Sequence, residues 1–257
     1  MRRAWVPLAA ALLVVVAPSS SASAQGRGGR AGGGPPPTGR AAAPKDLTGT
    51  WVSVVTEHWH LRMMVPPRGD FSMLPLNPAA RKIANAWDPA KEPAGGACKS
   101  YGAAAIMRVA GRFHVSWVND NTMRMEIDSG MQTRTFHFGG AAPAAQAPEW
   151  QGYSVASWEA LAARARGGAM PTQLKVVTTK MRPGYLRKNG IPYSANAMLE
   201  EWYDRFTEPN GDDWLVVTSI ITDPQYLTGP YATTNHFRKI PDKQGWDPTP
   251  CRADQAR

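Results

Sequence analysis

The chain has 257 residues and a formal net charge of +9, and charged residues make up only 19% of it. The first 45 residues carry six of these positive charges and no acid, so the remaining 212 residues have a net charge of only +3. The basicity is therefore mainly a property of the N-terminal part. Since no cluster resembles a DNA- or RNA-binding motif, we expect no nucleic-acid partner.

The first 24 residues have the pattern of an export signal. Arg2 and Arg3 form a basic start, an apolar run extends from Ala4 to Pro18, and Ala22-Ser23-Ala24 is a small-residue cleavage site. The apolar run is too short to span a membrane comfortably, and no other stretch approaches the roughly 20 residues needed. We therefore expect a secreted or periplasmic protein that starts at Gln25 and has no transmembrane segment.

Residues 25–45 are rich in Gly, Pro, Ala and Arg and offer almost nothing that a core can bury. This composition predicts a disordered tether, whose basic residues can contact an anionic envelope surface. Residues 46–257 are sufficient for a single domain with its own hydrophobic core.

From Gly49 onward, runs of β-branched and aromatic residues are separated by turn residues, which predicts strands. Three connections are short enough for hairpins, at Asn119-Asp120-Asn121, Asp128-Ser129-Gly130 and Pro209-Asn210-Gly211-Asp212. The nine predicted strands are Thr50–Met64, Arg112–Val118, Thr122–Ile127, Gln132–Phe138, Trp150–Trp158, Leu174–Met181, Met198–Thr207, Trp214–Thr222 and Thr233–Ile240.

Helix signals are few. Asn77 followed by Pro78 is a typical helix start and predicts a short helix over Ala79–Trp87. Ser157–Arg166 is a second helix candidate, with a surface excursion as the alternative. Because the strands follow one another without intervening helices, we predict a mainly β protein that forms an antiparallel up-and-down β-barrel, with a β-sandwich as the alternative.

A Gly-x-Trp sequence, Gly49 to Trp51, enters the first predicted strand, and Arg238 lies on the last. This pattern resembles that of lipocalins and the wider calycin group, in which the Trp closes one end of the barrel and a late Arg packs over it. The resemblance implies contact between Trp51 and Arg238 and a ligand cavity inside the barrel. The domain also resembles exported bacterial proteins of unknown function, which share the sequences at Arg182–Gly190 and Pro248–Cys251; that resemblance implies a location and no activity.

Cys98 and Cys251 are the two cysteines of the chain. In an oxidising compartment they predict one disulfide, which would clip the C-terminal segment to the loop before the central strands. The alternative is two free thiols, which are prone to oxidation after export.

The segment Arg182–Ser194 is longer than a hairpin connection needs, and long loops in compact domains are often functional. Its cations, tyrosines and amides can bind a carboxylate, a phosphate or a sugar; an ordered lid with solvated cations is the alternative. The predicted ligand-binding residues are Arg182, Tyr185, Arg187, Asn189, Tyr193 and Asn196, together with Trp51 and Arg238.

Two further sets of residues suggest chemistry. His58 and His60 would share one face of the first predicted strand, where His114, His137 or His236 could complete a site for a transition metal; polar residues on a half-exposed strand are the alternative. Glu201, Tyr203 and Arg205 would share one face of a later strand and could serve acid/base catalysis with His137. A cross-strand ion-pair ladder with Arg134 or Lys175 is the alternative explanation.

These patterns favour an exported protein that binds a small amphipathic or anionic molecule, without a cofactor. A periplasmic enzyme that uses the acid/base residues, with or without the metal, is the alternative. A third hypothesis is a structural protein of the envelope surface. Among the enzyme signatures that the sequence lacks are Gly-x-Ser-x-Gly, Cys-x-x-Cys and His-Glu-x-x-His.

Overall fold

The computed structural model describes residues 36–93, 95–159 and 172–255. The chain divides into two units, residues 1–36 and residues 37–257, and the second contains every helix and strand named below. In the described residues, no helix is long and apolar enough to cross a membrane.

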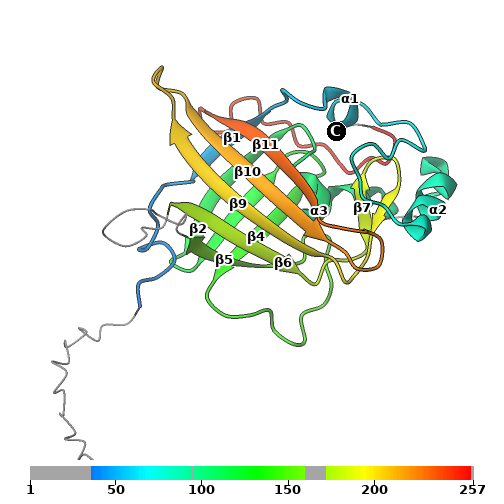
Figure 1. Ribbon diagram of the computed structural model, residues 1–257. Coiled ribbons are helices and arrows are strands. Elements are labelled where there is room, and N and C mark those ends of the chain that lie inside the picture. Colours follow the sequence, from blue (N-terminus) through cyan, green and yellow to red (C-terminus); the bar gives the residue numbers. More distant parts are fainter. Residues whose placement is uncertain (1–35, 94, 160–171, 256–257) are drawn as a thin grey trace, which may run out of the picture. The chain divides into compact units, whose positions relative to one another are not determined.

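Nine strands close into a barrel in the order β1-β11-β10-β9-β6-β5-β4-β3-β2 (Figure 1), which confirms the predicted fold class. All neighbours pair antiparallel except β4 and β5, which are parallel. The strands are β1 (Gly49–Val54), β2 (Arg112–Asn119), β3 (Thr122–Ile127), β4 (Gln132–Phe138), β5 (Tyr153–Glu159), β6 (Gln173–Thr179), β9 (Met198–Thr207), β10 (Asp213–Thr222) and β11 (Tyr231–Ile240).

Alternation of side chains directs one face of each strand into the barrel. On β10, for example, Leu215 and Val217 are buried while their neighbours are partly exposed. The interior is filled by large apolar side chains such as Trp51, Phe136 and Phe237, each at most 2% exposed. The middle of the barrel is therefore a packed core, as expected for a barrel of this size.

Short helices and a hairpin gather at one end of the barrel (Figure 1). The helix predicted from Asn77 and Pro78 is confirmed, because the Asn77 side chain accepts a hydrogen bond from the Ala80 amide at 2.9 Å. The elements at this end are α1 (Trp59–Arg62), α2 (Pro78–Ala86), the 3-10 turns η1 (Pro89–Lys91) and η2 (Gly96–Tyr101), α3 (Ala103–Ile106), β7 (Gly184–Arg187) and β8 (Ile191–Tyr193).

The first strand is shorter than predicted. Thr50–Met64 was expected to be one strand, but β1 ends at Val54 and α1 follows. The neighbouring β2 begins at Arg112, which pairs with Val52, so the chain beyond Val52 has no strand partner on that side. The second helix candidate is also corrected where it is described, since residues 157–159 belong to β5; the rest of Ser157–Arg166 lies outside the described residues.

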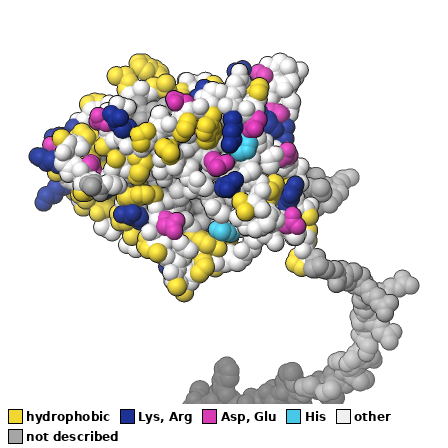
Figure 2. Space-filling model, turned by 180° about the vertical axis from the view of Figure 1, so that it is seen from behind, with side chains coloured by type: hydrophobic (Ala, Val, Ile, Leu, Met, Phe, Trp, Pro, Cys, Tyr) yellow, Lys and Arg dark blue, Asp and Glu magenta, His cyan; other side chains and the backbone are white. Residues whose placement is uncertain are grey.

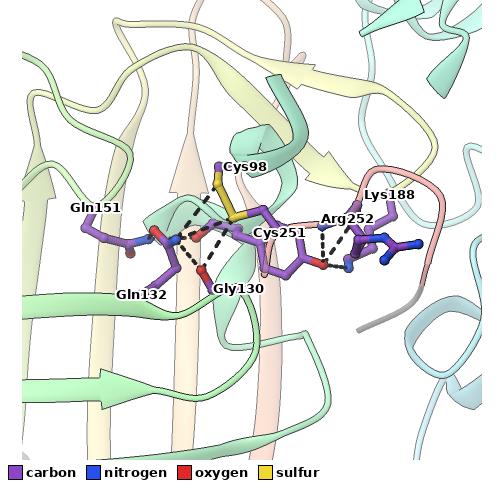
Figure 3. The surroundings of a disulfide bond; sticks show 8 residues. Cys98, Gly130, Gln132, Gln151, Lys188, Cys251 and Arg252 are labelled. Carbon is purple, nitrogen blue, oxygen red and sulfur yellow. Dashed lines mark hydrogen bonds between the residues drawn. A yellow bond between two sulfur atoms is a disulfide. The ribbon is translucent and has the colours of Figure 1, made fainter. Parts of the chain in front are cut away.

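The predicted disulfide between Cys98 and Cys251 is confirmed and closes a sequence separation of 153 residues. Figure 3 shows that it lies beside Gln132 on β4, whose side chain contacts both sulfur atoms. The following residue, Arg252, donates its amide to the hydroxyl of Tyr101 at 3.1 Å. The bridge and this hydrogen bond together hold the C-terminal segment against η2.

Candidate functional site

Three buried arginines meet at the end of the barrel that carries the helices. Arg62 comes from α1, Arg108 from the turn before β2 and Arg187 from the end of β7. They are 3%, 8% and 4% exposed. Buried arginines are rare unless paired, so this group, which we call the arginine pocket, requires an explanation. Its other lining residues are Leu61, Met64, Ser100, Ala105, Val109, Leu186 and Lys188.

Only part of the hydrogen-bonding capacity of these guanidinium groups is used. Arg62 donates to the Arg108 carbonyl at 3.1 Å and to the Glu57 carboxylate at 2.6 Å. Arg187 donates to the Ser72 carbonyl at 2.7 Å. Four buried nitrogen atoms find no hydrogen-bond partner within the described part of the chain, namely Nη2 of Arg62, Nη2 of Arg108, and Nε and Nη1 of Arg187.

The electrostatics of the pocket favour an anion. Burial lowers the pKa of Arg62 and of Arg108, although Glu57 opposes the change at Arg62 and Tyr231 opposes it at Arg108. Guanidinium groups nevertheless remain charged in proteins, and a buried charge without a partner is destabilising. The cavity has a volume of about 20 Å³, which is enough for one small polar group. An oxyanion such as a carboxylate or a phosphate would supply both the missing charge and the missing acceptors.

Lys188 lines the same pocket, but its ammonium group is held by other partners. It donates to the Tyr101 hydroxyl at 2.6 Å and to the Gln255 carbonyl at 2.7 Å, and it lies 3.9 Å from the centre of the Tyr101 ring. Burial lowers the pKa of Lys188 to about 7, although Asp254 favours the charged form. The labelled Lys188 lies beside the C-terminal segment in Figure 3. Lys188 therefore differs from the three arginines, each of which has a buried nitrogen without a partner in the described residues.

A second pocket shares one lining residue, Arg108, with the first. Its volume is about 290 Å³, and we call it the side pocket. Its one carboxylate, Glu57, lies 3.5 Å from His236 and is also bound by Arg62. Burial and the nearby Arg108 lower the pKa of His58, which favours its neutral form. The remaining lining residues are Met73, Tyr231, Ala232, Thr233 and Thr234.

Among the predicted ligand-binding residues, Arg187 alone lines the arginine pocket. The segment Arg182–Ser194 contains the hairpin of β7 and β8, which buries Arg187 because its turn packs tightly: Gly190 has φ +79° and lies against the Trp87 ring, where a Cβ would collide. Arg182 instead lies 4.1 Å from the centre of the Trp150 ring.

The other predicted residues of this segment have structural partners or lie elsewhere. The Tyr185 hydroxyl donates to Glu92 at 2.5 Å, and the Asn189 side chain donates to the Pro67 and Asp70 carbonyls at 3.0 Å each. Tyr193 is buried in the apolar cluster between the hairpin and α2, whereas Asn196 is exposed.

The expected contact between Trp51 and Arg238 is wrong by one residue. Trp51 pairs with Lys239, whose ammonium group lies 5.7 Å from the centre of the indole ring. Arg238 pairs with Val52 and therefore points away from the barrel interior, where it lies 3.7 Å from Asp212. Trp51 itself is fully buried and donates to the Leu47 carbonyl.

Of the predicted catalytic residues, Glu201 and Tyr203 meet at Arg134, whereas Arg205 and His137 lie elsewhere. Glu201 and Arg134 form a fully buried ion pair at 2.5 Å inside the barrel, and Arg134 also donates to the Tyr203 hydroxyl at 3.1 Å. Glu201 raises the pKa of Arg134 despite burial, and burial raises the pKa of Tyr203. Arg205 pairs instead with Asp213 at 2.7 Å, and His137 stacks on Tyr153 at 4.5 Å. Glu201 therefore has the ion-pair role that was the alternative.

The strand geometry assumed for the predicted metal site is also wrong. His58 has a left-handed conformation with φ +50°, and His60 lies in α1, so the two do not share a strand face. Within residues 36–93, 95–159 and 172–255, no three His, Cys, Asp or Glu side chains gather in a metal-binding arrangement. His236, one candidate for the third ligand, pairs with Glu57.

Arg62 and Arg108 were not identified from the sequence. Arg108 follows the apolar run Ala103-Ala104-Ala105-Ile106-Met107. A single cation next to so apolar a stretch is a signal of burial, and the sequence contained it.

The exposed charges are arranged differently: Figure 2 shows that on one face of the molecule Lys and Arg lie interspersed with Asp and Glu. In the arginine pocket, by contrast, three arginines lie together and Glu57 pairs with one of them, Arg62.

No protein-family model, curated protein or solved structure matches this chain. The function proposed below therefore depends on the geometry of the two pockets.

Proposed function

We propose that the protein is an exported binding protein that holds a small anionic molecule in the arginine pocket. The observation that carries the proposal is the set of four buried guanidinium nitrogens on Arg62, Arg108 and Arg187 that have no partner among the described residues. Among the residues that the structure describes, the carboxylate that forms an ion pair with one of these arginines is Glu57, which is hydrogen-bonded to Arg62. A bound oxyanion would satisfy the geometry of several N–H donors at once.

This proposal places the ligand at the end of the barrel. The middle of the barrel is filled by a packed apolar core and by the buried pair of Arg134 and Glu201.

The calycin-like character of the barrel remains part of the proposal, supported by the buried Trp51 on β1. Export is supported by the disulfide between Cys98 and Cys251, because such bonds persist in oxidising compartments. The enzyme alternative has weaker support, because Glu201 and Tyr203 are enclosed and already paired with Arg134.

The test is calorimetric titration of the chain from Gln25 to Arg257 with sodium phosphate, sulfate and acetate at constant ionic strength. We expect saturable binding of at least one of these anions. Arg187→Gln should weaken it by about 10- to 100-fold, because charge-assisted hydrogen bonds are lost. The matched control is Arg124→Gln, which removes the same charge from an exposed position on β3 and should leave the affinity unchanged.

A second measurement separates binding from structural damage. In anion-free buffer, Arg108→Met should raise the free energy of unfolding by about 1–3 kcal/mol, because it removes a buried charge without a partner. Saturating anion should then stabilise the wild type more than the variant. If no anion binds, or if Arg187→Gln binds as tightly as the wild type, the proposal is wrong.

A further inference from the structure

We infer that the side pocket holds an aromatic ring attached to the anionic group, so that the ligand is a small aromatic acid or an aryl phosphate. This inference rests on the proposed function. It starts from Arg108, which lines both the arginine pocket and the side pocket. In this proposal, a group bound at the Arg108 guanidinium extends from the arginine pocket toward the side pocket.

The size of the side pocket limits what can extend into it. Ligand pockets usually range from about 300 to 1,000 Å³, and the side pocket, at about 290 Å³, lies at the lower end. The arginine pocket, at about 20 Å³, has room for about one oxygen-sized group, so it would take an oxygen atom of the anionic group while the rest of the ligand lies outside it. The two volumes together fit one charged group attached to a single ring or to a short chain.

The walls of the side pocket favour a ring. Two imidazole rings, His58 and His236, the phenol ring of Tyr231 and the thioether of Met73 line it, and such groups pack well against aromatic faces. Tyr231 is only 4% exposed, and its ring centre lies 6.0 Å from the Arg108 guanidinium carbon, so an aromatic surface continues directly from the anion site.

The charge of the side pocket is consistent with an uncharged ring. Glu57 is neutralised by Arg62 at 2.6 Å and accepts a further hydrogen bond from the Thr56 hydroxyl at 2.7 Å. Burial raises its pKa, but Thr56 and Arg62 outweigh burial and the pKa of Glu57 falls below its ordinary value. This carboxylate is already paired, so it does not call for a cationic ligand.

The test compares each small anion with its aromatic counterpart, acetate with benzoate and phosphate with phenyl phosphate, by calorimetry on the chain from Gln25 to Arg257. We expect the aromatic member of at least one pair to bind about tenfold or more tightly, because the ring is removed from water. The pair that shows the gain distinguishes carboxylic acids from phosphate esters.

Two variants locate the ring. Ala232→Trp introduces a bulky side chain at an exposed position that lines the side pocket, so it should abolish the aromatic gain while the small anion still binds. Val118→Trp is the matched control at an exposed position of β2, and it should retain the gain.

The outcomes separate this inference from the proposed function. If acetate or phosphate binds through Arg187 but the ring adds nothing, the inference fails and the proposed function stands. The inference also fails if Ala232→Trp retains the full aromatic gain. If none of the four compounds binds, the proposed function fails as well.

Discussion

Two groups of buried charge in this protein differ in how they are compensated. Arg134 has a carboxylate, a phenol and a threonine hydroxyl as partners inside the barrel, through Glu201, Tyr203 and Thr178. Arg108 has no comparable side-chain acceptor in the described residues, and its Nη2 is unpartnered. Because desolvation is costly for both groups, the fold itself explains the first, whereas for the second we propose a bound anion.

The compensated pair leads to a prediction about stability. Glu201→Gln leaves Arg134 charged and buried without its counter-ion, so it should lower the free energy of unfolding by about 3–5 kcal/mol, as measured by urea denaturation. The double variant Arg134→Met/Glu201→Leu removes both charges and should be less destabilised than the single variant. A double variant at least as unstable as Glu201→Gln would contradict this account. Neither change should alter anion affinity, because the pair is not part of the arginine pocket.

At the scale of the element, the sequence predicted the strands where a strand has partners on both sides. The predicted boundaries of Thr122–Ile127, Gln132–Phe138 and Met198–Thr207 are those of β3, β4 and β9. The prediction was wrong where pairing stops, at Val52 toward β2 and at Val54 toward β11, because a neighbouring strand decides where a strand ends and periodicity does not contain that information.

The candidate site was harder to predict for a related reason. Arg62, Arg108 and Arg187 belong to segments far apart in the chain, and only the arrangement of α1, the turn after α3 and β7 at one end of the barrel brings them together. The predicted loop supplied Arg187 because cations in a long loop are a local signal. The three arginines come together only in the tertiary structure, so no local sequence pattern marks the site.

The C-terminal segment gives a prediction at the same scale. Cys98→Ala/Cys251→Ala should lower the free energy of unfolding by about 3–5 kcal/mol, because the bridge closes a very long loop in the unfolded chain. Urea denaturation under non-oxidising and oxidising conditions measures the effect. A reducing agent should destabilise the wild type and leave the double variant unchanged; equal midpoints for the oxidised wild type and the double variant would contradict the prediction.

At the scale of the whole molecule, the folded unit begins before the barrel's first strand. The Gly39 carbonyl accepts from the Trp158 indole at 2.6 Å, and the Gly39 amide donates to the Asn121 side chain at 2.7 Å. Lys45 pairs with Asp204 at 2.6 Å. Residues 37–45, which composition alone assigns to the tether, therefore contact β5, β9 and the turn between β2 and β3.

These contacts predict that a chain starting at Pro37 is more stable than one starting at Asp46. The shorter chain leaves the Trp158 indole and the Asn121 side chain without their partners, so we expect a difference of about 2–4 kcal/mol in the free energy of unfolding, measured by urea denaturation of the two chains. Gly39→Ala in the longer chain is the specific control, because a Cβ at this buried position would collide with the Phe138 ring. It should bring the longer chain close to the stability of the shorter one. Equal stability of the two chains would instead show that residues 37–45 lie on the barrel without stabilising it, and the domain boundary would then belong at Asp46.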